Sequence, residues 1–154
     1  MIEIPNFKNL DIRHIVCDYN GTIAKDGKVH PKVKALFEIL SKSYTLHVIT
    51  ADTFGSVHQQ LQDHNTHIKV LSGSDHTKEK AEYIASLGSE HCAALGNGNN
   101  DVEMLRSATI GIAILGEEGC AKEALFSADM VCKEITDALL AFIHPKRLIA
   151  TLRK

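Results

Sequence analysis

Short, continuously apolar runs alternate with amphipathic stretches along the sequence, and this pattern constrains the fold most. Strands of a parallel sheet covered on both faces are apolar throughout rather than alternately apolar and polar. Six runs predict buried strands, over residues 12–17, 46–49, 68–71, 91–95, 110–115 and 130–132. Their alternation with helical stretches predicts an α/β fold of three layers, with a mainly parallel sheet between two layers of helices.

The stretches between these runs have the apolar spacing of helices that bury one face. We predict helices over residues 31–42, 53–64, 78–87, 100–107, 121–126 and 135–143. Gly88 is a natural residue to end the third of them. We also expect a helical turn or short helix over residues 145–154, because Leu148, Ile149 and Leu152 can form one apolar strip.

Length, composition and charge fit an ordinary globular protein. The 154 residues suit one domain, so we expect residues 1–154 to form a single domain. The net charge of -2 gives no reason to expect a nucleic-acid or membrane partner. No apolar run approaches the roughly 20 residues of a membrane span, and no signal peptide is recognisable, so we expect a cytoplasmic location.

Four cysteines and nine histidines raise the question of disulfides or a metal site. No two cysteines form a CxxC pair, and three lie in or beside apolar runs, namely Cys17, Cys92 and Cys132. His58, His64 and His67 do not share one helical face, and no cysteine accompanies them. We interpret the cysteines as buried free thiols and the histidines as solvated surface residues.

The first polar cluster at a predicted strand end is Asp18-Tyr19-Asn20-Gly21-Thr22. An aspartate that ends a buried strand is costly unless polar groups or a metal surround it. A carboxylate in this place can attack phosphorus and form an aspartyl phosphate. Gly21 would let backbone amides approach an anion. An ordinary Asx turn after a strand is the competing interpretation.

The second cluster is Thr50-Ala51-Asp52-Thr53, directly after the second predicted strand. A hydroxyl at a strand end, followed by a helix N-terminus, suits a phosphate oxygen, so Thr50 and Ala51 are candidates for binding it. Either Asp52 or Thr53 could equally be an ordinary helix N-cap.

A lysine is the third candidate. Lys80 lies early in the helix after the third predicted strand, where its charge can neutralise a phosphate and a nucleophilic carboxylate together. Lys78 is a rival for this role. A solvated helix lysine is the simpler alternative.

The fourth cluster, Gly96-Asn97-Gly98-Asn99-Asn100-Asp101, follows the fourth predicted strand. Its oxygen-bearing side chains could bind Mg2+, which prefers carboxylate, carbonyl and water oxygens. The alternative is a polar loop that ends in a helix cap. The three clusters and the helix that carries Lys80 follow the carboxyl ends of predicted parallel strands. These ends meet at one edge of the sheet, and ligands bind at that edge.

Read in order, these segments resemble the haloacid dehalogenase superfamily. IVCDYNGT is similar to its apolar strand followed by DxDGT, and HVITAD to its second strand, which ends in Thr or Ser. Lys80 in KAEYIASLG is similar to its lysine, and GNGNND to its GDGxND. Over residues 12–132 the resemblance is closest to the phosphorylation domain of P-type ATPases and its small soluble relatives.

The resemblance implies a Rossmann-like domain that uses Mg2+ and a phosphorylated substrate. It implies that Asp18 is the nucleophile and that Thr50 and Lys80 hold the phosphoryl group. The carboxylates of Asp18 and Asp101 and the carbonyl of Asn20 would bind Mg2+. Asn97 is a further candidate ligand, and Asn100 would support the loop.

Two residues depart from the phosphatase pattern. Asn20 replaces the second Asp of DxD, which protonates the leaving group and then activates water; an amide can do neither. P-type ATPases also lack this Asp. Asn97 replaces the first Asp of GDGxND. Both changes predict slow turnover.

The spacing between the motifs predicts that no cap domain is inserted. Residues 22–31 have room for a small hairpin, and residues 50–80 for one helix and one strand. An open site suits a large substrate. Alternatively, another subunit or a protein partner covers the site.

Two hypotheses of different classes follow. The first is a capless phosphatase or phosphotransferase that works through phospho-Asp18. The second is a regulatory phospho-acceptor or a catalytically degenerate binding module, because Asn20 and Asn97 replace the usual aspartates.

Overall fold

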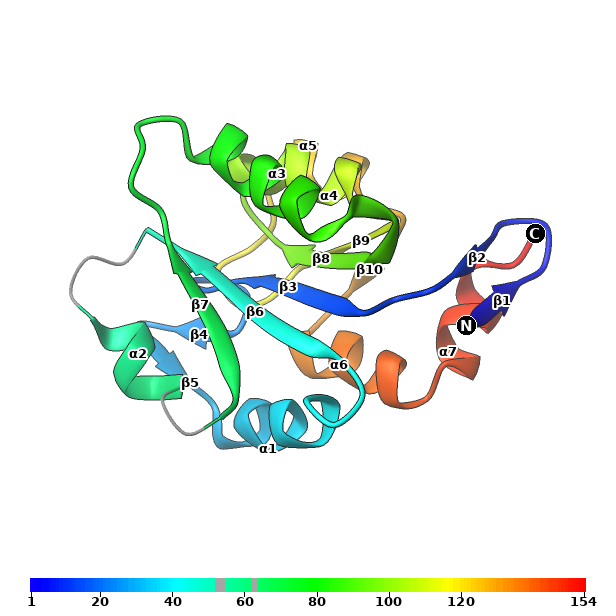
Figure 1. Ribbon diagram of the computed structural model, residues 1–154, viewed down its shortest axis with the longest axis horizontal. Helices are drawn as coiled ribbons and strands as arrows, with labels where there is room; N and C mark the ends of the chain where they lie inside the picture. Colours follow the sequence, from blue (N-terminus) through cyan, green and yellow to red (C-terminus); the bar gives the residue numbers. More distant parts are fainter. Residues whose placement is uncertain (52–54, 62–63) are drawn as a thin grey trace.

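A central parallel sheet organises the protein, as a computed structural model that describes residues 1–51, 55–61 and 64–154 shows (Figure 1). Its six strands lie in the order β10-β9-β8-β3-β6-β7. Their bounds are β3 His14–Asp18, β6 Thr45–Thr50, β7 Thr66–Val70, β8 Cys92–Gly96, β9 Ile110–Ile114 and β10 Met130–Cys132. The predicted α/β fold with a parallel sheet is confirmed.

Helices cover both faces of this sheet. One face carries α3 (His76–Leu87), α4 (Val102–Ser107) and α5 (Lys122–Ser127), which lie together in Figure 1. The other face carries α1 (Pro31–Leu40), α2 (Ser56–Leu61) and α6 (Ile135–Ile143). Two 3-10 turns, η1 (Ser89–His91) and η2 (Asn99–Asp101), flank β8. None of the helices in the described part of the chain is long and apolar enough to cross a membrane.

The buried side chains form two clusters, one on each face of the sheet, because successive residues of a strand point to opposite faces. In β3, Val16 packs in the cluster beneath α3 and α4, whereas Ile15 and Cys17 pack in the larger cluster beneath α1 and α6. The continuously apolar runs of the sequence are therefore strands buried on both faces.

A short hairpin follows β3 and lies next to its polar end. It consists of β4 (Ala24–Lys25) and β5 (Lys28–Val29), paired antiparallel. The buried Tyr19 donates a hydrogen bond from its hydroxyl to the Gly27 carbonyl, 2.8 Å away, and so ties the hairpin to the body. This hairpin fits the room predicted for residues 22–31.

The two ends of the chain meet at the far end of the molecule (Figure 1). There β1 (Ile2–Ile4) and β2 (Lys8–Leu10) form a hairpin against α7 (Lys146–Leu152). The predicted C-terminal helix is confirmed, with Leu148 and Leu152 buried in the core. The sequence analysis did not predict the β1–β2 hairpin.

The other predicted elements agree with the structure to within a few residues. The helix expected over residues 53–64 is present as α2 (Ser56–Leu61). The capping roles considered for Asp52 and Thr53 lie outside the described residues. All four cysteines are free thiols, and three of them are buried, as predicted.

The prediction of solvated surface histidines is wrong for His47, which is 4% exposed. Its two ring nitrogens form hydrogen bonds, one to His14 at 3.0 Å and one to the Tyr83 hydroxyl at 2.7 Å. Its ring also stacks on that of His67, on the neighbouring strand. The partners come from three other elements, so the sequence alone gave no sign of them.

Candidate active site

The predicted site clusters meet at the point in the sheet where the order of strand connections reverses. From the central strand β3 the chain continues outward through β6 and β7, then returns to the other side of β3 and continues through β8, β9 and β10. Asp18 is the last residue of β3. A carboxyl end beside such a switch point is the usual ligand-binding edge of an α/β sheet.

The turn after Asp18 depends on a glycine. Gly21 has a φ of 79°, which is accessible to glycine at little cost. A methyl group in its place would lie 2.4 Å from the Nδ2 atom of Asn97. The Gly21 N–H donates to the carbonyl of Ala24 at 2.9 Å. The Gly21 amide therefore serves the turn itself, and the expected approach of backbone amides in this segment to an anion stays a prediction.

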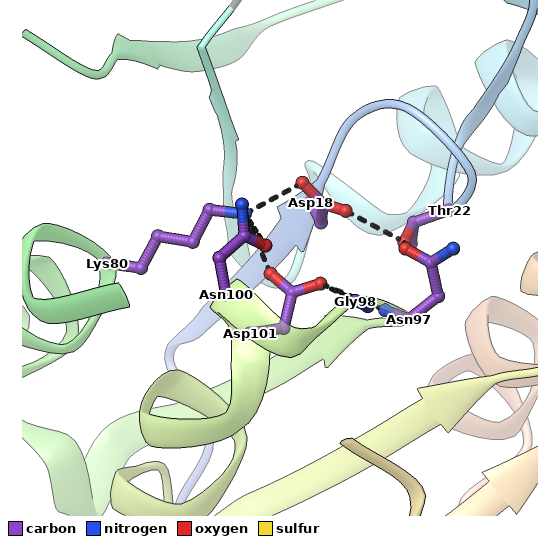
Figure 2. A network of polar contacts seen from close by, with 7 residues as sticks. All are labelled: Asp18, Thr22, Lys80, Asn97, Gly98, Asn100 and Asp101. Carbon is purple, nitrogen blue, oxygen red and sulfur yellow. Dashed lines mark hydrogen bonds and ion pairs between the residues drawn. The ribbon is translucent and has the colours of Figure 1, made fainter. Parts of the chain in front are cut away.

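Lys80 joins the two buried carboxylates (Figure 2). Its Nζ lies 2.9 Å from Asp18 Oδ1, 2.7 Å from Asp101 Oδ1 and 3.2 Å from Asn100 Oδ1. The three N–H donors of the ammonium group thus have three acceptors. Lys80 is 1% exposed, whereas its rival Lys78 is exposed and faces Glu82 on the surface of α3.

Asp101 holds the loop between β8 and α4 in shape. Its Oδ2 accepts hydrogen bonds from the backbone N–H groups of Asn97 and Gly98, each at 3.0 Å, while its Oδ1 pairs with Lys80. The side chain is fully buried and packs against Gly96. Its oxygens already have partners within the protein.

Asn97 connects the first motif to the loop after β9. Its Oδ1 lies 3.3 Å from the Thr22 hydroxyl, which also lies 3.4 Å from Asp18 Oδ2 (Figure 2). Its Nδ2 donates to the carbonyl of Gly119 at 3.1 Å. An aspartate could not make this last bond, because an ionised carboxylate has no donor.

The electrostatics of the cluster follow from its burial. Burial and, after it, the nearby Asp101 carboxylate raise the pKa of Asp18 to about 7, although Lys80 opposes both effects. Burial would lower the pKa of Lys80, but the carboxylates of Asp18 and Asp101 outweigh it and raise the pKa. The two carboxylates therefore favour the charged form of Lys80, whereas burial and the like charge of Asp101 disfavour the charged form of Asp18.

A cavity of about 220 Å3 opens above this cluster. Most of the predicted residues line it, namely Asp18, Asn20, Thr50, Ala51, Lys80, Asn97 and Asn100. Gly98 and Leu71 also line it, and the sequence analysis gave neither a role. Two predicted residues do not line this cavity: Asp101 lies behind it, and Gly21 borders a neighbouring cavity.

Thr22 was quoted in the first motif but given no role. Its hydroxyl lies within 3.4 Å of both Asp18 and Asn97, so it can orient either side chain. The signal was its place in the motif, four residues after Asp18. The direction of its side chain depends on the turn at Gly21 and cannot be read from spacing alone.

The donor set around the cavity fits Mg2+. Asp18, Asn20, Asn97 and Asn100 all carry oxygens and line the cavity, and Mg2+ prefers oxygen ligands. Asp101 is fully buried and does not line the cavity, so it fits a role behind these residues better than direct metal contact.

Comparisons with known proteins bear on the family and on the fold. A sequence model described as haloacid dehalogenase-like hydrolase matches residues 50–139, more than half of the chain. An uncharacterized protein of Methanocaldococcus jannaschii is 45% identical over 60 residues, which are 39% of this chain and 64% of that relative. The chain thus matches less than two thirds of that relative's length.

Two solved structures share the fold. The first is 3-deoxy-D-manno-octulosonate 8-phosphate phosphatase from Moraxella catarrhalis, solved with magnesium ion, phosphate ion and KDO; its TM-score is 0.73 at 16% identity, over 91% of this chain and 90% of that one. The second is a zinc-transporting PIB-type ATPase. Its TM-score is 0.63 at 19% identity, over 79% of this chain and 20% of that one.

Proposed function

Because the chain belongs to the haloacid dehalogenase-like hydrolases, we propose that it is a Mg2+-dependent phosphatase or phosphotransferase that forms an acyl phosphate on Asp18. The observation that carries this proposal is the placement of Asp18. Its carboxylate lines a small cavity at the switch point of the sheet, and Lys80 holds one of its oxygens at 2.9 Å.

The first chemical step follows from the position of these groups. A carboxylate oxygen of Asp18 attacks the phosphorus of the substrate, and the bond from phosphorus to the leaving oxygen breaks, giving an acyl phosphate. Lys80 can reduce the negative charge on the transferred group, and the hydroxyl of Thr50, which lines the same cavity, can donate to one of its oxygens. The released oxygen takes its proton from water, because Asn20 has no acidic proton to give.

The second step regenerates the free carboxylate. Water attacks the phosphorus of the acyl phosphate, the Asp18 oxygen leaves, and the proton of the water passes to solvent. Asn20 lines the cavity but cannot accept that proton. We therefore expect the second step to be slow, and an acceptor other than water would make the protein a phosphotransferase.

Mg2+, when bound, would neutralise the negative charge of the phosphoryl group. Asp18, Asn20 and Asn97 are the residues that would hold it, with Asn100 beside them and Asp101 behind them. This assignment moves Asp101 from a ligand to a support, because it is fully buried and does not line the cavity, while its oxygens hold Lys80 and the loop backbone.

We also propose that the site works without a cap. Within the described residues, the segment between Thr22 and Pro31 contains the β4–β5 hairpin, and the segment between Thr50 and His76 contains α2 and β7. A large substrate, a second copy of the chain or a protein partner could then cover the cavity. Cytoplasmic location and a single domain over residues 1–154 remain predictions.

Trapping the acyl phosphate tests the function. The protein is incubated with acetyl phosphate and Mg2+, quenched in acid, and analysed for a phosphate on Asp18 that hydroxylamine removes. We expect the label in the wild type and its loss in Asp18→Asn. Asp26→Asn is the matched control, because Asp26 is exposed in the hairpin turn. Labelling of Asp18→Asn would refute the nucleophile.

A second candidate function is a regulatory phospho-acceptor or a degenerate binding module, favoured by Asn20 and Asn97. It differs from the first in turnover. Release of several equivalents of phosphate from an aryl phosphate, dependent on Mg2+ and abolished by Asp18→Asn, would support the enzyme. Formation of one stable equivalent without release would support the regulatory role.

A further inference from the structure

A larger cavity lies beside the catalytic one and has no part in the chemistry proposed above. Its volume is about 610 Å3, against about 220 Å3 for the catalytic cavity. The β4–β5 hairpin, the start of α1, the loop after β9 and the start of α6 line it. Its volume falls within the range of cavities that bind small organic molecules, roughly 300–1,000 Å3.

The two cavities share no lining residue, and side chains from both lie beside Gly21. A methyl group at Gly21 would lie 2.4 Å from Asn97 Nδ2 and 2.6 Å from Glu118 Oε2. Asn97 lines the smaller cavity, whereas Glu118 and Gly21 line the larger one. A ligand in the larger cavity would therefore touch the turn that follows Asp18 without entering the phosphoryl site.

The lining of the larger cavity combines apolar surface with basic groups. Apolar side chains come from four segments of the chain and include Ile23, Val33, Leu115 and Ile135. Four lysines and three glutamates also line it. One lysine, Lys25, forms an ion pair with Glu117, which joins the hairpin to the loop after β9.

Set against the other three lysines are two glutamates of the lining, Glu118 and Glu134, that also form no ion pair in the described ranges, so the lining keeps a small excess of positive charge. Lys28, Lys32 and Lys133 form no ion pair with any residue in the described ranges. Lys32 is the second residue of α1, and Lys133 lies two residues before α6. Basic residues near helix N-termini oppose the helix dipole, so these lysines do not serve the stability of the helices.

We propose that this cavity binds a small organic anion with an apolar body, at a site distinct from the phosphoryl site. The apolar residues would contact the body of the ligand. Lys32 in α1 and Lys133 just before α6 would contact its anionic group. The ligand would lie against Gly21 and Thr22, which form the turn after the nucleophile.

Fluorescence titration with anilinonaphthalene sulfonate tests the proposal, because this probe has apolar rings and one anionic group. We expect binding of one probe per chain. Lys32→Glu and Lys133→Glu should each weaken it by about 10-fold through charge reversal beside the anion. Both changes place an acidic group at a helix start, where it is favourable, so the fold should survive; circular dichroism checks this.

Two control variants separate this cavity from other surfaces. Lys146→Glu makes the same charge change at the start of α7, at the far end of the molecule, and should leave the affinity unchanged. Phe126→Ser removes the apolar side chain that is 71% exposed on α5 and should also leave it unchanged. Equal weakening by Lys146→Glu, or loss of binding in Phe126→Ser, would overturn the proposal.

Competition distinguishes the two cavities. With Mg2+ present, inorganic phosphate should not displace the probe, because the two cavities share no lining residue. Displacement by phosphate would overturn the proposal of a separate site. The titration needs no catalytic turnover, so a failure here leaves the proposed phosphatase untouched, and the reverse also holds.

Discussion

Replacing Lys80 by methionine removes a positive charge that joins two buried carboxylates. In the native protein, Asp18 and Asp101 each have an oxygen within 3 Å of the ammonium nitrogen of Lys80. Without that nitrogen, no positive charge separates the two carboxylates at this point. Methionine has a similar length and fills most of the space, so the change tests charge rather than volume.

The size of the effect follows from burial. The Lys80 side chain is 2% exposed and that of Asp101 is fully buried, so water cannot replace the lost partner. Removing one member of a buried ion pair typically costs 3–5 kcal/mol. We expect Lys80→Met to lower the free energy of unfolding by about 3–5 kcal/mol, and Asp101→Asn added to it to recover part of that loss.

Urea unfolding followed by circular dichroism measures this loss, with an unchanged m-value showing that the unfolded state is the same. Lys78→Met is the matched control on the same helix. Lys78 is exposed and lies 3.8 Å from Glu82, an i,i+4 pair, so its loss should cost about 0.3–0.5 kcal/mol. If Lys80→Met were no more destabilising than Lys78→Met, the account of a charge-balanced cluster would be wrong.

Three further predictions concern the turn, the pH dependence and the metal. Gly21→Ala should destabilise the protein and reduce labelling of Asp18, because the new methyl group would lie 2.4 Å from Asn97 Nδ2. Gly27→Ala is the control: Gly27 also has a φ of 79°, but nothing lies within 4 Å of the new methyl group, so only backbone strain should lower the free energy of unfolding. Equal decreases of that free energy in urea unfolding would contradict this prediction. Burial, together with His14 and His67, lowers the pKa of His47 from 6.5 to about 4, so the unfolded chain binds a proton that the folded one does not, and the free energy of unfolding should fall as the pH drops from 6.5 towards 4. His47→Gln should reduce this fall, and an identical pH profile would show that His47 is not its source. Mg2+ should bind weakly alone and more tightly with inorganic phosphate, because Asp18 and Asp101 are partly neutralised by Lys80; calorimetry that shows tight binding without an anion would contradict this.

Much of the fold could be predicted because the strands are buried on both faces. A continuous apolar run such as residues 110–115 is typical of a strand covered on both faces, so the alternation of strands and helices could be predicted from these runs. The β1–β2 hairpin was missed because each strand has three residues, too few for a period to show. His47 was interpreted as a surface residue although it lies in the predicted strand over residues 46–49, because its polar partner Tyr83 comes from α3, 36 residues away.

The candidate site could be predicted as a set of residues but not as a set of contacts. Lys80 and Lys78 are two residues apart on one helix and therefore point to different sides, and the sequence favoured the one that faces the site. The sequence could not separate Asp101 from Asn97, because both follow β8 within one loop. The backbone amides that occupy Asp101, and the cavity that Asn97 faces, appear only once that loop is folded.

The decay of phospho-Asp18 in the wild type and in Asn20→Asp tests the central claim most directly. Asn20 is exposed and lines the catalytic cavity, so an aspartate there should fold normally and supply the missing proton acceptor. Both proteins are labelled with acetyl phosphate, freed of donor, and quenched over time. The account predicts that the label accumulates in the wild type and decays about 100-fold faster in Asn20→Asp. Equal decay rates would show that another group activates the water, and absence of label on Asp18 in both proteins would contradict the proposed function.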